Sequence, residues 1–251
     1  MDNLDKRELN KLYWPKAKTI VVGNSPSLLN YNFGEQIDSF TKVIRCNYCN
    51  TKGFEKHVGS KTNIWVTSMT KDKVRKRDKN SLSKFGEIIS IKKDKYFLPN
   101  KLSDKIVWFR HSEHQKEYRG IVEHKFGKLK HTSILSVGSP PSHYVAIPDE
   151  IKSIISYPKD EKGWVVTTGL VAIMKAASIY EKVSIAGFTF YTETSEKRNT
   201  SYNGLHWSEN LRKYALKHVK VLNKYVEKGK VSFLIPEEEK LFNKIKDGEI
   251  K

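Results

Sequence analysis

The chain has 251 residues, of which 46 are Lys or Arg and 28 are Asp or Glu, so its formal net charge at pH 7 is +18. A hydrophobic share of 38% with 11% aromatic residues suffices for a packed core and excludes a wholly disordered chain. No run of about 18 apolar residues occurs, and the first 18 residues lack the apolar stretch of a signal peptide. The sequence therefore predicts neither a membrane-spanning helix nor a secretion signal.

Short β-branched runs alternate along the chain with stretches that have helical spacing. Strands are predicted at residues 19–23, 42–45, 63–67, 105–110, 133–137, 182–186 and 230–234. Helices are predicted between residues 28 and 39, 168 and 180, and 208 and 226. This order predicts an α/β fold, a single Rossmann-like domain over residues 1–251 with a mostly parallel twisted sheet flanked by helices. Ligands of such sheets bind at the carboxyl ends of the strands.

The positive charge is concentrated in residues 71–130, where 18 Lys or Arg stand against 8 Asp or Glu, a net charge of +10. One interpretation is a solvated face of the protein. The alternative is a surface for anionic lipid headgroups or anionic glycans, since each basic residue near such a membrane contributes on the order of 1 kcal/mol. Single-stranded nucleic-acid binding is disfavoured, because the basic clusters lack aromatic interleaving of the kind that stacks on bases.

Glycines, amides and hydroxyls gather at predicted strand ends and helix starts. The groups are Gly23-Asn24-Ser25, Arg45-Cys46-Asn47, Thr167-Thr168-Gly169, Gly187-Phe188 with Tyr191 beyond it, and His206-Trp207-Ser208-Glu209. Glycine lets a ligand approach the backbone, and hydroxyls at a helix N-terminus suit an anion. The alternative for each group is an ordinary turn or helix cap. A histidine three residues from a glutamate in a loop before a helix is a candidate general base.

Cys46 and Cys49 are the two cysteines, and they form a Cys-x-x-Cys pair. Zinc would need two more ligands at matching spacing, and a redox pair would begin a helix, whereas Cys46 follows a predicted strand. A structural role is therefore favoured. The sequence contains neither Asp-x-Asp nor Gly-x-Ser-x-Gly, so it predicts no divalent-metal clamp and no nucleophile-elbow hydrolase. We expect no bound metal and no cofactor.

Three blocks in the right order resemble a known family. Residues 20–68 read IVVGNSPSLLNYNFGEQIDSFTKVIRCNYCNTKGFEKHVGSKTNIWVTS and resemble the large sialyl motif of the eukaryotic-type sialyltransferases, glycosyltransferase family 29. Residues 163–188, GWVVTTGLVAIMKAASIYEKVSIAGF, resemble the small sialyl motif, and His206-x-x-Glu209 is similar to the third motif. Bacterial family 42 sialyltransferases share a simpler form of this plan, which Gly23–Ser27 also matches. Residues 163–209 hold the second and third blocks, and residues 71–162 form a variable segment expected to face the acceptor.

The resemblance implies a metal-independent transferase of the sialyltransferase-like variant of the GT-A fold. It implies transfer of sialic acid from CMP-sialic acid to a glycan hydroxyl, with inversion. The implied contacts are Asn24, Ser25 and Asn47 to ribose and phosphate, Thr167, Thr168, Gly169, Gly187 and Phe188 to cytidine, and Tyr191 and Tyr202 to the leaving phosphate, with Gly23 admitting the donor. His206, beside Glu209, would deprotonate the acceptor hydroxyl. His218 is the alternative base, because the final motif of the family has no clean match in this chain.

Departures from the family pattern add further expectations. Thr19 and Tyr180 stand where vertebrate members carry disulfide cysteines, which favours a microbial or viral enzyme in a reducing cytoplasm. There it would lie peripherally on the inner face of the membrane, with residues 71–130 on the anionic lipid surface. CMP-Kdo, used in capsule or lipopolysaccharide synthesis, is an alternative donor that the motifs do not separate from CMP-sialic acid. A non-enzymatic basic protein that binds nucleic acid or membrane is the alternative from another class.

Overall fold

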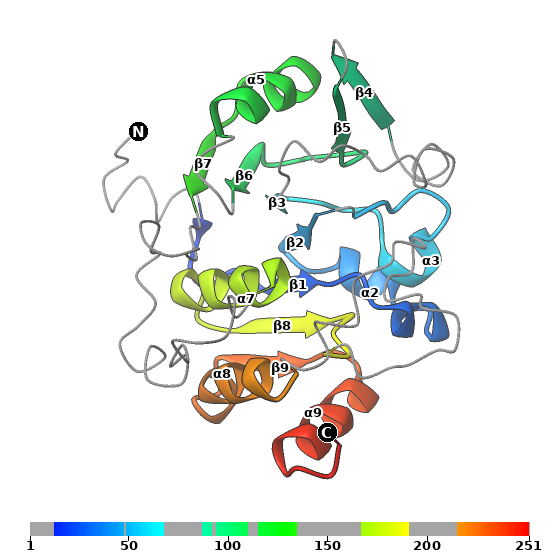
Figure 1. Ribbon diagram of the computed structural model, residues 1–251, viewed down its shortest axis with the longest axis vertical. Coiled ribbons are helices and arrows are strands. Elements are labelled where there is room, and N and C mark those ends of the chain that lie inside the picture. Colours follow the sequence, from blue (N-terminus) through cyan, green and yellow to red (C-terminus); the bar gives the residue numbers. More distant parts are fainter. Residues whose placement is uncertain are drawn as a thin grey trace, which may run out of the picture.

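In the computed structural model, the structure describes residues 13–47, 49–67, 87–91, 94–109, 115–134, 167–190 and 215–250. Seven parallel strands form one sheet in the order β7-β6-β3-β2-β1-β8-β9 (Figure 1). The strands are β1 (Thr19–Val22), β2 (Lys42–Cys46), β3 (Ile64–Thr67), β6 (Ile106–Phe109), β7 (His131–Ile134), β8 (Val183–Ala186) and β9 (Val231–Phe233). The predicted α/β class with a parallel sheet and flanking helices is confirmed.

The order of the strands reverses at β1. From β1 the chain adds β2, β3, β6 and β7 on one side, and it then returns to place β8 and β9 on the other. The register aligns Val22, the last residue of β1, with Arg45 of β2 and with Ala186 of β8. A crevice for ligands opens at such a reversal, outside the carboxyl ends of the two strands that flank it. The topology therefore predicts a ligand site at the carboxyl ends of β1 and β8.

Helices cover both faces of the sheet. On one face α7 (Thr168–Ile179) lies over the centre in front of β1, and α8 (Ala215–Glu227) lies beside β9 (Figure 1). Residues of α7 and α8 share a buried cluster with Val21 and Ile185 of the strands. Ile20 and Ala186 point to the opposite face, as alternation along a strand requires, and join a second cluster with Leu28 and Ile37. That face carries η1 (Pro26–Asn30), α2 (Gly34–Asp38) and α3 (Glu55–Val58).

The central strands form because they are buried on both faces. All four residues of β1, β3 and β6 are buried, which suits a continuous apolar run in a parallel sheet. Trp65 and Trp108 are fully enclosed, and each indole finds a hydrogen-bond acceptor, the Asn47 carbonyl oxygen at 2.8 Å and the Tyr13 hydroxyl at 3.0 Å. The large aromatic side chains thus fill the core without leaving a buried donor unpaired.

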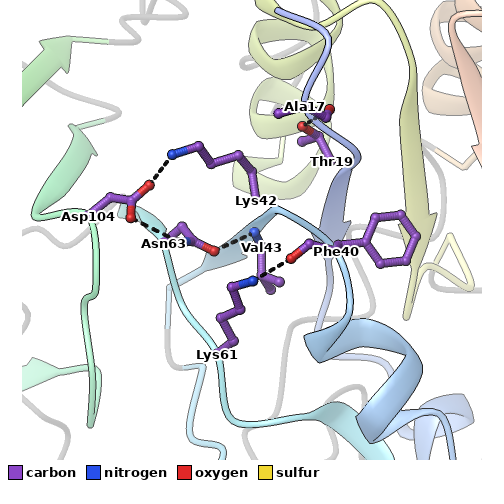
Figure 2. Close-up of polar contacts among 8 residues, drawn as sticks. All are labelled: Ala17, Thr19, Phe40, Lys42, Val43, Lys61, Asn63 and Asp104. Atoms are coloured by element: carbon purple, nitrogen blue, oxygen red, sulfur yellow. Dashed lines mark hydrogen bonds and ion pairs between the residues drawn. The ribbon is translucent and has the colours of Figure 1, made fainter. Parts of the chain in front are cut away.

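A polar clamp holds the amino ends of the strands (Figure 2). The Lys42 ammonium pairs with Asp104, which lies before β6. Asp104 also accepts a bond of 3.0 Å from the Asn63 amide nitrogen, and the Asn63 amide oxygen accepts one of 2.9 Å from the Val43 N–H. The Lys61 ammonium donates to the Phe40 carbonyl oxygen. These bonds tie β2, β3 and β6 together at the edge opposite the predicted site.

Three predicted elements differ in detail from the structure. The helix expected between 28 and 39 is two short helices, η1 and α2, because Pro26 with the Ser25 cap starts the first turn early. The strand expected at 133–137 is β7 at His131–Ile134, and residues beyond it lie outside the described part of the chain. The helix expected from 208 is described from Ala215.

Five helices and strands have no counterpart in the prediction. They are the antiparallel hairpin of β4 (Glu87–Ile91) and β5 (Asp94–Leu98), and the helices α3, α5 (Gln115–Phe126) and α9 (Pro236–Lys246). Within the described ranges, no helix is both long and apolar enough to cross a membrane.

Candidate active site

The carboxyl ends of β1 and β8 join through backbone contacts that only glycine permits. The Gly23 N–H donates to the Ala186 carbonyl oxygen at 2.8 Å, and the Ser25 N–H donates to the Gly187 carbonyl oxygen at 3.1 Å. A Cβ on Gly23 would lie 2.2 Å from the Gly187 carbonyl oxygen. Gly187 has a φ of +78°, in the left-handed region that side chains disfavour. The two predicted glycines therefore meet, and their lack of side chains is required by packing.

Phe188 connects this junction to the N-terminus of α7. Its ring edge lies 3.2 Å from the position of a Cβ on Gly23 and 2.7 Å from that of a Cβ on Gly169. The ring thus covers two glycine backbones that come from different parts of the sequence. Three predicted site residues are brought together at the switch point by this arrangement.

Asn24 and Asn47 lie at the ends of neighbouring strands. The Asn24 amide nitrogen donates to the Cys46 carbonyl oxygen at 3.0 Å, which fixes the orientation of the amide because a carbonyl can only accept. The Asn24 amide oxygen is buried and accepts no hydrogen bond from the part of the chain that the structure describes. Asn47 has a φ of +49°, and its N–H donates to the Val66 carbonyl oxygen at 2.7 Å. The chain therefore presents a fixed, unused acceptor at the end of β1.

Hydroxyl groups line the same edge of the sheet. The Ser25 hydroxyl lies 3.1 Å from that of Thr189, and it also accepts a bond of 3.2 Å from the Ser27 N–H as the cap of η1. The Thr167 hydroxyl accepts from the Leu170 N–H at 3.4 Å and caps α7, and Thr168 is buried in the first turn. These hydrogen bonds thus confirm the alternative interpretation, in which the Ser25 and Thr167 side chains cap helices. A ligand role at the start of α7 is a separate prediction, since the helix dipole favours an anion there.

Glu238 is a site residue that sequence reasoning missed. It comes from α9, is 2% exposed, and accepts bonds from the Ser27 hydroxyl at 2.7 Å and from the Gly187 N–H at 3.0 Å. In the sequence it is one of three consecutive glutamates after Pro236, and nothing there separates it from its exposed neighbours. Thr189 was missed too, because it follows the predicted strand end without a motif of its own.

Four predicted site residues, Tyr191, Tyr202, His206 and Glu209, lie outside the described residues. The alternative base His218 is described in the first turn of α8, and its side chain is 2% exposed. A base must reach the acceptor hydroxyl within hydrogen-bond distance. The enclosure of His218 makes it a poor candidate in this geometry, and His206 stays a prediction.

The Cys46 and Cys49 thiols are free and buried. Burial, which penalises the thiolate, raises the pKa of Cys49 to about 12 and raises that of Cys46 further. Because the thiolate is the form that attacks a disulfide, both thiols are unsuited to thiol–disulfide exchange at neutral pH. This geometry fits the structural interpretation of the pair.

Comparison with known proteins gives a consistent family. The model described as glycosyltransferase family 29 (sialyltransferase) matches residues 10–229. Beta-1,6-galactosyltransferase GALT29A of Arabidopsis thaliana is 27% identical over 197 residues, which cover 72% of this chain and 44% of that protein. A CMP-N-acetylneuraminate-beta-1,4-galactoside alpha-2,3-sialyltransferase of Rattus norvegicus is 27% identical over 212 residues, 80% of this chain and 50% of that protein. The chain thus spans about half the length of these relatives.

A solved structure shares the fold. The crystal structure of a mammalian sialyltransferase in complex with Gal-beta-1-3GalNAc-ortho-nitrophenol aligns with a TM-score of 0.50 at 18% identity, over 92% of this chain and 74% of that chain. At this identity the similarity shows the arrangement of the sheet and its helices.

Proposed function

Because the chain belongs to glycosyltransferase family 29, we propose that it transfers sialic acid from CMP-sialic acid to a glycan hydroxyl with inversion. The observation that carries the proposal is the junction of β1 and β8 at the topological switch point, where Gly23 meets Gly187 and the Phe188 ring reaches Gly169 at the start of α7. Membership of an enzyme family, together with this junction, disfavours a purely non-enzymatic basic protein.

The donor would lie across the carboxyl ends of β1, β2 and β8. The fixed Asn24 amide oxygen is an acceptor, so it suits a ribose hydroxyl rather than a phosphate oxygen. Phe188, over the glycine backbones, offers a flat wall for cytosine. Thr168 and Gly169 stand at the N-terminus of α7, where the helix dipole favours a negative charge. Ser25 and Asn47 complete the proposed contacts.

His206 would act as the general base. It would take the proton of the acceptor hydroxyl while that oxygen attacks the anomeric carbon from the side opposite CMP. The bond to the phosphate then breaks with its electron pair on the CMP oxygen, which inverts the configuration. Tyr191 and Tyr202 would donate hydrogen bonds to the departing phosphate, and Glu209 would lie beside the base. We assign no metal and no cofactor to this reaction.

Other donors compete with CMP-sialic acid. CMP-Kdo presents the same nucleotide and a similar keto-acid sugar. The Arabidopsis relative is called a galactosyltransferase, and it is as similar to this chain as the rat sialyltransferase is.

The test is turnover with purified protein on CMP-sialic acid, CMP-Kdo and UDP-galactose, each with galactose-terminated and other glycan acceptors. We expect CMP release that depends on acceptor and on CMP-sialic acid. Turnover with UDP-galactose alone would overturn the proposed donor.

We also propose that the enzyme docks peripherally on an anionic membrane, on the cytoplasmic face. Lys18, Lys182 and Lys230 directly precede β1, β8 and β9, and the register aligns them in one row. Lys105 and Lys130 precede β6 and β7 in the same way. Like charges on neighbouring strands repel, so an anionic partner would stabilise this edge. The proposed surface thus includes described members of residues 71–130 and extends beyond them.

An exposed tryptophan supports a lipid partner. Trp14 is 55% exposed and has a φ of +47°. The Glu181 N–H donates to the Pro15 carbonyl oxygen at 3.0 Å, which holds this turn beside the start of β8 and its lysine. Tryptophan next to basic residues is typical of a membrane interface.

Sedimentation with phosphatidylserine vesicles tests the membrane proposal. We expect K18E/K182E to reduce binding at least fivefold and K240E/K244E, an equal charge change on exposed positions of α9, to reduce it far less. An equal loss of vesicle binding in the two double variants would show that only the net charge of the protein matters, and not this edge of the sheet. A preference for single-stranded RNA over vesicles would contradict the membrane proposal.

A further inference from the structure

The helix α9 places one carboxylate at the candidate site, although this helix follows the part of the chain that matches the family. The family model ends at residue 229, and α9 runs from Pro236 to Lys246. Glu238 is buried in the first turn of α9, whereas Glu237 and Glu239 on either side are exposed. Glutamate is almost never fully buried unless its carboxylate is paired. Its partners therefore show what the burial serves.

The carboxylate bridges the two loops of the switch point. Both of its oxygens lie 3.0 Å from the Gly187 nitrogen, at the end of β8. One of them also accepts the Ser27 hydroxyl at 2.7 Å, in the short helix that follows β1. Gly187 is the residue whose backbone contacts Gly23, and Ser27 donates its N–H to the Ser25 hydroxyl. One side chain thus ties together the segments that follow β1 and β8.

Local helix chemistry does not account for this placement. Ile235 is the N-cap of α9 and makes no side-chain cap bond, and Glu238 stands three residues after it. A glutamate at this position of a capping box would turn back to the N–H of the cap residue. The Glu238 carboxylate also reaches Gly187 and Ser27, which lie 51 and 211 positions earlier in the sequence.

We infer that Glu238 is a positioning residue that fixes the β1 and β8 loops in the geometry that binds the donor nucleotide. This rests on the proposed function for the identity of the ligand. Without the carboxylate, the buried Gly187 N–H would lose its acceptor, and an unpaired buried donor is costly enough to move the loop. Movement at Gly187 would carry Phe188 and Thr189 with it, since they follow directly in the chain.

The test compares E238Q with E239Q, a matched loss of charge at an exposed neighbour in the same turn. Glutamine keeps one acceptor oxygen but places an amide N–H₂ against one of the two donors. Two readouts are measured at a temperature where every variant is folded: the CMP dissociation constant by calorimetry, and backbone hydrogen exchange of residues 23–27 and 187–190 without ligand. S27A provides a second route if E238Q does not fold, because it removes one partner and leaves the carboxylate.

We expect E238Q to weaken CMP binding at least tenfold and to speed exchange in both loops, with E239Q within twofold of wild type. A merely structural role would lower the melting temperature while leaving the CMP affinity of the folded protein unchanged, and that result would overturn the inference. If wild-type protein does not bind CMP, the proposed function fails. In that case faster hydrogen exchange in both loops of E238Q or S27A would still support the positioning role of Glu238. Unchanged exchange in both loops would refute that role.

Discussion

The close approach of β1 and β8 predicts that Gly23→Ala is destabilising. A Cβ at residue 23 would lie 2.2 Å from the Gly187 carbonyl oxygen and 3.0 Å from the Gly187 carbonyl carbon. Both are backbone atoms, so relief requires the two strand ends to separate. Separation stretches the bonds from the Gly23 and Ser25 N–H groups to β8, which measure 2.8 and 3.1 Å.

The size of the effect follows from these contacts. Overpacking in a well-packed region costs about 1–3 kcal/mol, and weakening two buried hydrogen bonds adds about 0.5–1.5 kcal/mol each at most. We expect a loss of about 2–6 kcal/mol in the free energy of unfolding. For a chain of this length, each kcal/mol lowers the melting temperature by about 2–4 °C, so the expected fall is about 4–24 °C.

Thermal unfolding followed by circular dichroism measures the loss, with Gly120→Ala as the matched control. Gly120 lies exposed in α5, and a Cβ there would meet no heavy atom within 4 Å. Alanine is the better helix former, so this control should gain roughly 0.5–1 kcal/mol. A melting temperature for Gly23→Ala within 1 °C of wild type would refute the reasoning about close backbone approach.

The remaining predictions concern the ligand, the base and alkaline pH. Asn24→Ala should weaken CMP binding at least tenfold by calorimetry, and an unchanged affinity would show that the Asn24 amide does not contact the nucleotide. His206→Ala should abolish turnover while keeping CMP affinity, whereas His218→Ala, at a buried position, should mainly lower the melting temperature; near-normal turnover of His206→Ala would exclude it as the base. Burial raises the pKa of Tyr13 from 10.0 and that of Cys49 from 9.0, each to about 12. Because the folded chain holds these protons more tightly than the unfolded chain, the stability they contribute is complete below about pH 9 and is lost as pH rises to about 12. Melting temperatures that stay level between pH 9 and 11 would contradict this.

Short apolar runs made the sheet predictable. β1, β2, β3, β6, β8 and β9 begin and end within two residues of their predicted bounds, because strands buried on both faces leave continuous β-branched runs. The glycines at 23 and 187 were predicted as ligand contacts, and the structure adds a packing reason that local sequence does not show. The N-cap at Thr167 was likewise readable from residue type alone.

Contacts between distant segments were not predictable. Glu238 differs from its neighbours only because the rotation of α9 turns it toward Gly187, and that rotation depends on Phe242 and Ile245 packing into the core. The β4–β5 hairpin escaped detection because charged residues interrupt its sequence, and its strands pair with each other rather than with the main sheet. The strand order, which creates the crevice, is set by packing of the whole chain.

The central claim is that a cytidine nucleotide binds at the junction of β1 and β8. Hydrogen exchange with mass spectrometry on the wild-type chain, with and without saturating CMP and with UMP as control, tests it most directly. The account predicts slower exchange in residues 23–27, 168–170 and 187–190 with CMP and little change with UMP. Protection confined to other segments, or equal protection by both nucleotides, would contradict it.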